Sequence, residues 1–355
     1  MYEKISIKSS FGDYDVTFQS WQNSVRQFEK KDNIFIVDRL VADLYPEIHN
    51  LHVTKIYVEA TEEAKSYASI GMTMKRALEL GLCRESKLIG IGGGITQDIT
   101  SFAASVLMRG VDWVFYPTNL LAQCDSCIGS KTSVNIGSFK NQIGGFFPPC
   151  AVFIDRDFRK TLAQKDIFSG LGEMMHYILV DGSTDLGQLP GLIDQARTDP
   201  GILDQLIQKS LLIKKKMIEI DEFDRGPRCV FNYGHTFGHA IEACTEYRVP
   251  HGIAVAYGMD LANFLSVNLD HVSIEFRNNA RVALAKIWFD TPLPAINTSD
   301  YVKALKRDKK SSRGIIRPIL TKGQGKMFQE QLTLTCDLKK LIHDYFEQEI
   351  YSRNI

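Results

Sequence analysis

The sequence predicts an α/β protein of two domains, with a parallel sheet in the first domain and an all-α second domain. Over the first 160 residues, short apolar runs alternate with helical stretches, which is typical of a parallel sheet covered by helices. After about residue 155, strand-like runs become scarce and helical periodicity dominates. The length of 355 residues also favours two domains of roughly 100–200 residues each. We therefore expect domains at residues 1–158 and 159–355.

The expected strands are short and the expected helices are long. Residues 3–8 and 14–19 alternate in character around Gly12-Asp13, which predicts a β-hairpin. Further strands are expected at the apolar runs 34–37, 55–59, 88–91 and 113–116. Helices are expected at 62–82 and 96–108, and in the second domain at 161–182, 201–221, 235–247, 252–268, 273–288 and 337–351.

The composition argues against several classes of protein. The 42 Lys and Arg residues balance 42 Asp and Glu residues, so the chain lacks the net basic charge of a general nucleic-acid binder, although a local basic pocket for a small anion stays open. No run approaches 18 consecutive apolar residues, and the N-terminus lacks a signal-peptide core, so we expect no membrane span. The seven cysteines are scattered and odd in number, which is typical of a reducing compartment. We expect a cytoplasmic protein.

A run of three glycines lies between a predicted strand and a predicted helix. Gly92, Gly93 and Gly94 would allow a phosphate to approach the backbone, where the helix N-terminus supplies N–H donors. The dinucleotide fingerprint G-x-G-x-x-G is not met, because Gln97 stands at its third glycine, and a tight turn explains the run equally well. Asp38 ends an early strand, where an acidic residue binds a ribose hydroxyl or simply caps a helix.

Three of the eight histidines, His235, His239 and His251, lie within 17 residues. His235 and His239 are four residues apart and would share one face of a helix. A catalytic zinc usually has three protein ligands, often histidines with one carboxylate. Glu173 lies in an apolar helical segment and is a candidate for that carboxylate, because an unpaired buried charge is costly; the alternatives are structural histidines and an exposed Glu. His176 shares the face of Glu173 and could be a ligand, an acid–base group or only a neighbour.

Six basic residues stand beside loop signals and could converge on an anionic substrate: Lys131, Lys140, Lys214, Arg228, Lys309 and Lys310. Taken singly, each is better explained as a solvated surface side chain. Cys124 and Cys127 have the C-x-x-C spacing but lack a second pair for zinc. We interpret these two cysteines as small packing residues.

Together these residues resemble a known family, 3-dehydroquinate synthase and its relatives the sugar-phosphate cyclases, over roughly residues 30–325. The matching motifs are Gly92-Gly93-Gly94 with Asp98, Met108-Arg109-Gly110, Pro117-Thr118-Asn119-Leu120-Leu121-Ala122-Gln123, Asp125 with Lys131-Thr132, Lys140-Asn141, Gly170-Leu171-Gly172-Glu173, Asp221-Glu222, Arg228 with Asn232-Tyr233-Gly234-His235-Thr236-Phe237-Gly238-His239, His251-Gly252 and Asp308-Lys309-Lys310. The number and order of these motifs argue against a chance match. The resemblance implies a Rossmann-like NAD-binding domain followed by an all-α metal- and substrate-binding domain.

The resemblance also implies one bound NAD and one divalent metal, with zinc expected and cobalt as the alternative. The metal ligands would be Glu173, His235 and His251, so the pair four residues apart would not both be ligands. The implied NAD contacts are Asp38, Glu62, Lys65, Gly92, Gly93, Gly94, Asp98, Thr118 and Asn119.

Two further sets of residues follow from the same resemblance. The implied catalytic residues are Asp125, Lys131, Lys140, Asn141 and His239. The implied substrate-binding residues are Arg109, His176, Lys214, Arg228, Asn232 and Lys310. Arg109 would reach the phosphate of a substrate in a neighbouring subunit, which implies a homodimer.

The implied reaction converts a heptulosonate 7-phosphate into a carbocycle by NAD-dependent oxidation, phosphate elimination, reduction and intramolecular aldol closure. Such an enzyme is a carbon–oxygen lyase without net redox change. One alternative is a cyclase of secondary metabolism that acts on sedoheptulose 7-phosphate or an amino analogue. Another is an NAD-dependent polyol dehydrogenase on the same fold. Retention of Arg228 and Asn232 favours a substrate that carries a carboxylate.

Three positions depart from the family's pattern. His176 replaces a usual Lys that contacts the substrate, so this change predicts an altered choice of sugar acid or sugar phosphate. Asn119 replaces the second Thr of a Pro-Thr-Thr motif near the NAD site. Gln97 replaces a Gly and would put a side chain near the pyrophosphate turn. The last two changes could be neutral, whereas His176 stands at the most informative position.

Overall fold

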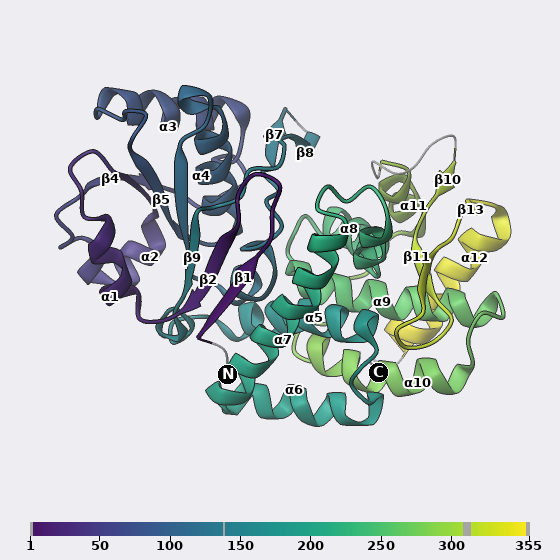
Figure 1. Cartoon of the computed structure of the whole chain (residues 1–355). Coiled ribbons are helices and arrows are strands. Elements are labelled where there is room, and N and C mark those ends of the chain that lie inside the picture. Colours follow the sequence, from purple (N-terminus) through teal and green to yellow (C-terminus); the bar gives the residue numbers. More distant parts are fainter. Residues whose placement is uncertain (1–2, 138, 308–313, 353–355) are drawn as a thin grey trace. The chain divides into compact units, whose positions relative to one another are not determined.

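The computed structural model describes residues 3–137, 139–307 and 314–352. The chain divides into a first unit, Met1–Leu162 with Ile207–Phe223, and a second unit, Ala163–Leu206 with Asp224–Ile355 (Figure 1). The predicted domains at 1–158 and 159–355 stay a prediction. They differ from these units chiefly at residues 207–223, which are compact with the first unit although they lie far beyond its other residues in the sequence.

A seven-stranded sheet in the order β1-β2-β9-β6-β5-β3-β4 forms the centre of the first unit (Figure 1). Its strands are β1 (Lys4–Ile7), β2 (Tyr14–Phe18), β3 (Ile34–Asp38), β4 (Thr54–Val58), β5 (Lys87–Gly92), β6 (Asp112–Pro117) and β9 (Ala151–Ile154). Strands β1 and β2 pair antiparallel, and every other neighbouring pair is parallel. The predicted parallel sheet and the predicted N-terminal hairpin are both confirmed.

The helices of the first unit differ in their bounds from those that the sequence predicted. They are α1 (Trp21–Val25), α2 (Arg39–Leu44), α3 (Tyr67–Glu79) and α4 (Gly94–Val106), and a hairpin of β7 (Val134–Ile136) and β8 (Phe139–Ile143) stands apart from the large sheet. Helix α4 stops two residues early because Met108 and Arg109 have φ angles of 51° and 68°. A right-handed helix cannot continue through left-handed backbone.

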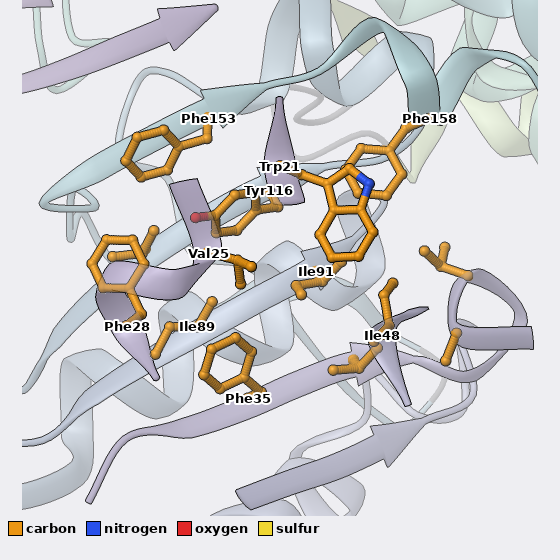
Figure 2. Close-up of a cluster of buried hydrophobic side chains, with 14 residues drawn as sticks. Trp21, Val25, Phe28, Phe35, Ile48, Ile89, Ile91, Tyr116, Phe153 and Phe158 are labelled. Atoms are coloured by element: carbon orange, nitrogen blue, oxygen red, sulfur yellow. The ribbon is translucent and has the colours of Figure 1, made fainter. Parts of the chain in front are cut away.

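The core of the first unit is aromatic and aliphatic (Figure 2). Trp21 stacks on Phe158 with ring centroids 5.8 Å apart, and Tyr116 stacks on Phe153 at 5.1 Å. All five residues of β3 are buried, so this strand contributes to both faces of the sheet. Parallel strands buried on both faces read as continuous apolar runs, which explains why the sequence revealed these strands.

The second unit is helical, as predicted. Its helices are α5 (Gln164–Asp181), α6 (Leu189–Thr198), the first residues of α7 (Pro200–Ile220), α8 (His235–Cys244), α9 (His251–Asn268), α10 (Ile274–Trp288), α11 (Thr298–Lys306) and α12 (Cys336–Asp344). Two small antiparallel sheets were not predicted, β10 (Ile315–Ile316) with β13 (Leu332–Thr333) and β11 (Ile319–Thr321) with β12 (Met327–Gln329). Strands this short carry too few residues for a recognisable period. Among the helices that the structure describes, none combines the length and apolar character that a membrane span requires.

Glycines bring α9 into backbone contact with its neighbours. A Cβ atom on Gly252 of α9 would lie 1.8 Å from the carbonyl oxygen of Ser169, and one on Gly172 of α5 would lie 2.2 Å from the carbonyl oxygen of Gly252. A Cβ atom on Gly258 of α9 would lie 2.1 Å from the carbonyl oxygen of Gly234, which directly precedes α8. No side chain fits at these crossings, so α5 and the start of α8 approach α9 more closely than other residues would permit.

Candidate active site

The close helix crossings of the second unit determine where three donor side chains lie. Glu173 follows Gly172, His235 follows Gly234, and His251 precedes Gly252. Each predicted metal ligand is therefore adjacent in sequence to a glycine at a backbone contact. The glycines bring residues from α5, α8 and α9 together although they are distant in the sequence.

The three predicted ligands form one compact donor group. Glu173 Oε1 lies 3.6 Å from His235 Nε2, and Glu173 Oε2 lies 3.8 Å from His251 Nε2. One donor atom from each residue lies within 4.8 Å of the other two. Ligand atoms that bind one zinc-type ion at roughly 2.0–2.2 Å lie at comparable distances from one another.

The environment of Glu173 fits a divalent cation. Its side chain is 2% exposed, and Oε2 makes no hydrogen bond with any described residue. Burial raises the pKa of Glu173, but the neighbouring histidines, His235 first, more than offset burial and the net shift is downward. Burial holds the pKa of His235 well below its usual value. A carboxylate grouped with imidazole side chains is a typical donor set of a divalent metal site, and an unpartnered buried carboxylate oxygen otherwise has a large energetic cost.

A second donor group shares His251. His239, Glu242 and His251 also offer three atoms within 4.8 Å of one another. Glu242 Oε2 lies 3.2 Å from His251 Nδ1. Sequence analysis missed Glu242, although its spacing held a signal, because residues 235, 239 and 242 repeat at the i, i+4, i+7 positions of one helix face.

His176 is fully buried at 0% exposure, close to the donor group. Its ring centroid lies 4.8 Å from that of Tyr177 and 5.0 Å from that of His235. Nδ1 lies 3.4 Å from Glu173 Oε1, and neither ring nitrogen makes a hydrogen bond with a described residue. The predicted substrate contact of His176 stays a prediction, and within the second unit the side chain is a neighbour of Glu173.

The other predicted residues of the second unit have different exposures. Arg228 is buried and lies in the short 3₁₀ segment Pro227–Asn232, where Asn232 Nδ2 donates a hydrogen bond to the carbonyl of Cys229 at 2.9 Å. His239 is exposed, and its ring centroid is 5.5 Å from that of His235. Lys309 and Lys310 lie outside the described residues.

In the first unit, the predicted glycine turn connects β5 to α4. A Cβ atom on Gly92 would lie 2.4 Å from Thr96 Oγ1, and one on Gly93 would lie 2.4 Å from Asn119 Nδ2. The Thr118 backbone N–H donates to the carbonyl of Gly92 at 2.9 Å. Packing within the protein therefore already favours a glycine at Gly92, and Gly94 leaves the first residue of a 13-residue helix without a side chain.

At two departures from the family's pattern, the side chains make hydrogen bonds within the first unit. Gln97 Nε2 donates to the carbonyl of Ser126 at 2.6 Å, and Ser126 Oγ donates to Gln97 Oε1 at the same distance. Asn119 Oδ1 accepts from the backbone N–H of Ala122 at 2.9 Å. The side chains of Gln97 and Asn119 thus stabilise the segment after β6.

Asp38 caps α2. Its Oδ1 accepts a hydrogen bond from the backbone N–H of Leu40 at 3.0 Å, and burial raises the pKa of its carboxyl group. Capping is the simpler of the two interpretations that the sequence left open. Binding of a ribose hydroxyl by Asp38 remains a prediction.

A polar network joins the predicted NAD residues to the predicted catalytic residues. Lys65 Nζ lies 2.6 Å from Asp98 Oδ2 and 2.7 Å from Asn141 Oδ1. Burial raises the pKa of Asp98 to about 6, although Lys65 opposes the shift. Asn135, which sequence analysis missed, donates to Glu62 Oε2 at 2.7 Å and accepts from the Asn141 backbone N–H at 2.9 Å. Its contacts come from tertiary packing, and no local pattern marks them.

The remaining residues of the first unit include one buried ion pair. Lys214 Nζ donates to Asp125 Oδ1 at 2.6 Å, so this lysine is paired rather than solvated as its sequence context suggested. Lys140 Nζ lies 3.4 Å from Glu62 Oε2. Lys131 and Arg109 are exposed.

The C-x-x-C pair is buried, as its interpretation as packing residues requires. Cys124 and Cys127 are both almost completely inaccessible, and burial raises the pKa of the Cys127 thiol to about 12. A thiol with so high a pKa is a poor nucleophile and a poor metal ligand. All seven cysteines lie in the described part of the chain, and no disulfide joins any of them.

Comparison with known proteins identifies relatives across most of the chain. The model of the 3-dehydroquinate synthase N-terminal family matches residues 55–169, and that of the C-terminal family matches residues 170–311. The chain is 35% identical over 293 residues to the 3-dehydroquinate synthase of Alkaliphilus metalliredigens, covering 82% of each chain. It is 37% identical over 300 residues to that of Dictyoglomus thermophilum, covering 83% of this chain and 84% of the other.

A solved structure shows the same fold. It is a 2-deoxy-scyllo-inosose synthase complexed with carbaglucose-6-phosphate, NAD+ and Co2+, with a TM-score of 0.85 and 24% sequence identity. The similarity covers 97% of this chain and 99% of that one.

The chain combines two units of different kinds. The α/β unit has a glycine turn at a helix N-terminus, and the helical unit has a Glu-His-His donor group. These features define a class of two-unit enzymes. Within that class, this chain belongs to the 3-dehydroquinate synthase family. It is a phosphate-eliminating cyclase of the 3-dehydroquinate synthase type, and hence a lyase. The resemblance inferred from the ordered motifs is confirmed.

Proposed function

We propose that the protein is a 3-dehydroquinate synthase that cyclises 3-deoxy-arabino-heptulosonate 7-phosphate with release of phosphate. The observation that carries the proposal is the donor group of Glu173, His235 and His251, whose atoms lie within 4.8 Å of one another. Relatives at 35% and 37% identity carry the name of this activity.

Two bound groups belong to the proposal. Glu173, His235 and His251 would hold one divalent metal, zinc or cobalt, and the Gly92–Gly94 turn with Asp38 would hold NAD. When bound, the metal supplies a Lewis acid and NAD supplies reversible acceptance of hydride. The solved 2-deoxy-scyllo-inosose synthase, which has the same fold, was complexed with NAD+ and Co2+.

The chain's own residues bind the substrate and move its protons. Arg228 is buried, and a guanidinium offers a carboxylate two parallel N–H donors, so we assign it the substrate carboxylate. His239 is exposed beside His235 and is assigned a proton transfer at its ring. Lys214 is oriented by Asp125, which makes that pair suited to a fixed anion contact.

The proposed assembly is a cytoplasmic homodimer in which Arg109 contacts a substrate phosphate in the neighbouring subunit. Arg109 is exposed and sits in left-handed backbone between α4 and β6, with a φ angle of 68°. This backbone ends α4 and leaves the Arg109 side chain outside the hydrophobic core, which supports a role for Arg109 in a contact with the neighbouring subunit. The absence of disulfides among the seven cysteines supports a reducing compartment.

Phosphate release from 3-deoxy-arabino-heptulosonate 7-phosphate tests the proposal. Purified protein would be supplied with zinc and catalytic NAD, and NADH absorbance would be followed in the same sample. Phosphate release without NADH accumulation is expected. Steady accumulation of NADH would instead identify a polyol dehydrogenase, and activity confined to sedoheptulose 7-phosphate would reject the carboxylate-bearing substrate.

Substitution of Arg228 tests the carboxylate assignment. We expect Arg228→Ala to raise KM for the heptulosonate roughly 10–100-fold, the value of a lost charge-assisted contact. KM for a sugar phosphate without a carboxylate should change far less. Arg225→Ala, at an exposed arginine three residues earlier, is the control. Equal increases for both substrates would remove Arg228 from this role.

A further inference from the structure

We propose that Glu242 is a positioning residue that holds His251 in the tautomer and orientation required of a metal ligand. The inference rests on the metal group of the proposed function and adds a residue that the family's motifs did not indicate. It concerns the coupling of two side chains, one on α8 and one at the first residue of α9.

The His251 ring lies between two carboxylates. Nδ1 lies 3.2 Å from Glu242 Oε2, and Nε2 lies 3.8 Å from Glu173 Oε2. Glu242 is partly buried and Glu173 is almost completely buried, so neither carboxylate is a mobile surface group. Each ring nitrogen therefore faces a different acidic side chain.

This arrangement decides which nitrogen carries the proton. A neutral imidazole has one N–H donor and one nitrogen with a free lone pair. A carboxylate at Nδ1 accepts a hydrogen bond and stabilises the proton there, which leaves the Nε2 lone pair directed toward Glu173. Carboxylates that accept from the second nitrogen of a ligating histidine also increase its basicity.

His235 shows the same geometry with a different partner. Its Nδ1 lies 3.2 Å from the backbone carbonyl of Tyr233, and its Nε2 lies 3.6 Å from Glu173 Oε1. Both histidines thus present Nε2 to the same carboxylate and have an acceptor at Nδ1. The acceptor beside His235 Nδ1 is a backbone carbonyl. The acceptor beside His251 Nδ1 is the side chain of Glu242, so a substitution can remove it.

The competing interpretation is a second metal held by His239, Glu242 and His251, whose donor atoms lie within 4.8 Å of one another. Such an ion would need the lone pair of His251 Nδ1, so that nitrogen could not also donate a proton to Glu242. The two interpretations predict different numbers of bound ions, one per chain for a positioning carboxylate and two for a second site.

The experiment measures metal binding by the full chain without NAD or substrate. Metal-free protein would be titrated with Zn2+ against a chelator, and Co2+ would report ligand geometry through its visible absorption. We expect Glu242→Leu to weaken binding of one ion by roughly 10–100-fold and to change the Co2+ spectrum. Glu242→Gln should lose less metal affinity than Glu242→Leu, because the amide oxygen still accepts a hydrogen bond. The affinity of Glu242→Asp should lie between those of Glu242→Leu and the wild type.

Controls separate positioning from folding. The thermal midpoint of the metal-free protein should be the same for the wild type and the Glu242→Gln variant, and Glu246→Gln, at an exposed glutamate four residues later, should bind metal like the wild type. Wild-type affinity in all Glu242 variants would overturn the proposal. So would two ions in the wild type with one lost from Glu242→Leu.

Failure of the proposed function would look different. A wild-type chain that binds metal but releases no phosphate would reject the substrate and leave the role of Glu242 standing. A wild-type chain that binds no divalent metal would reject the metal group itself, and with it the role of Glu242.

Discussion

The predicted site residues of the first unit and those of the second unit differ in how their charges are balanced. Three ion pairs of the first unit join residues within the predicted set: Lys65 with Asp98, Lys140 with Glu62, and Lys214 with Asp125. In the second unit, Glu173 faces imidazoles, and one of its oxygens makes no hydrogen bond with any described residue.

This difference indicates two ways of organising a site. Ion pairs and amide hydrogen bonds hold the residues of the first unit in place by contacts within the protein. In the donor group of the second unit, the buried Glu173 carboxylate has an oxygen without a hydrogen bond to any described residue, and the proposed divalent cation would compensate for it. Removing a ligand should therefore impair the second unit mainly through metal loss, and breaking an ion pair should impair the first unit through folding stability.

The largest expected effect comes from the metal ligands. His235→Ala or His251→Ala should weaken metal binding by more than about 100-fold, because loss of an outer partner alone already costs roughly 10–100-fold. Activity should be lost together with the metal. Metal content by elemental analysis and phosphate release check the prediction, with His343→Ala on α12 as the control. A metal-replete, active His251→Ala variant would contradict the ligand assignment.

A large effect on folding is expected from Lys65→Met. The substitution leaves Asp98 without its cation, and at pH 8 we expect the free energy of unfolding to fall by about 3 kcal/mol, at the lower end of values for broken buried pairs. The double variant Lys65→Met with Asp98→Leu should regain most of this loss. Urea unfolding measures the free energy of unfolding of the single and the double variant. Lys75→Met, at an exposed lysine on α3, should change stability by less than about 0.5 kcal/mol.

A smaller effect is expected from pH. The pKa of Asp98 is about 6 in the folded chain, above its ordinary value of 3.8, so the folded state binds this proton more tightly than the unfolded state. The contribution of this group to the free energy of unfolding is therefore highest below pH 4, falls as pH rises through about 6, and levels off from about pH 7.

Asp98→Asn should remove this dependence. The difference in unfolding free energy between wild type and variant should change by about 1–2 kcal/mol between pH 4 and 6. Parallel stability curves for the two proteins across that window would contradict the prediction.

The smallest expected effect concerns His176, the main departure from the family's pattern. A lysine at this position has a flexible stem that can carry an ammonium group beyond the site of the buried ring, toward an anionic substrate. We expect His176→Lys to raise kcat/KM for the heptulosonate several-fold, up to about tenfold, with metal content unchanged. Unchanged kinetics would show that His176 is not a specificity switch, and a loss of metal would show that it serves Glu173 instead.

Much of the fold could be predicted from local pattern. The buried strands β3, β5 and β6 are continuous apolar runs, and the long helices have clear periodicity. The early end of α4 could not be predicted, because the left-handed backbone at Met108 and Arg109 has no local signal in those residue types. The short strands β10 to β13 could not be predicted either, because two or three residues are too few to show a periodic pattern.

By itself, the sequence determined the family and most of the long helices and buried strands, and it supplied a list of residues predicted to carry chemistry, because these depend on local pattern and on ordered motifs. It did not determine which of those residues are partners. Asn135 bonds to Glu62, which lies far from it in the sequence, through tertiary packing, and Glu242 lies against His251 where α8 and α9 approach each other at glycines. Only the tertiary structure decides such pairings, since a hydrogen bond depends on distances of a few ångströms that sequence spacing does not specify.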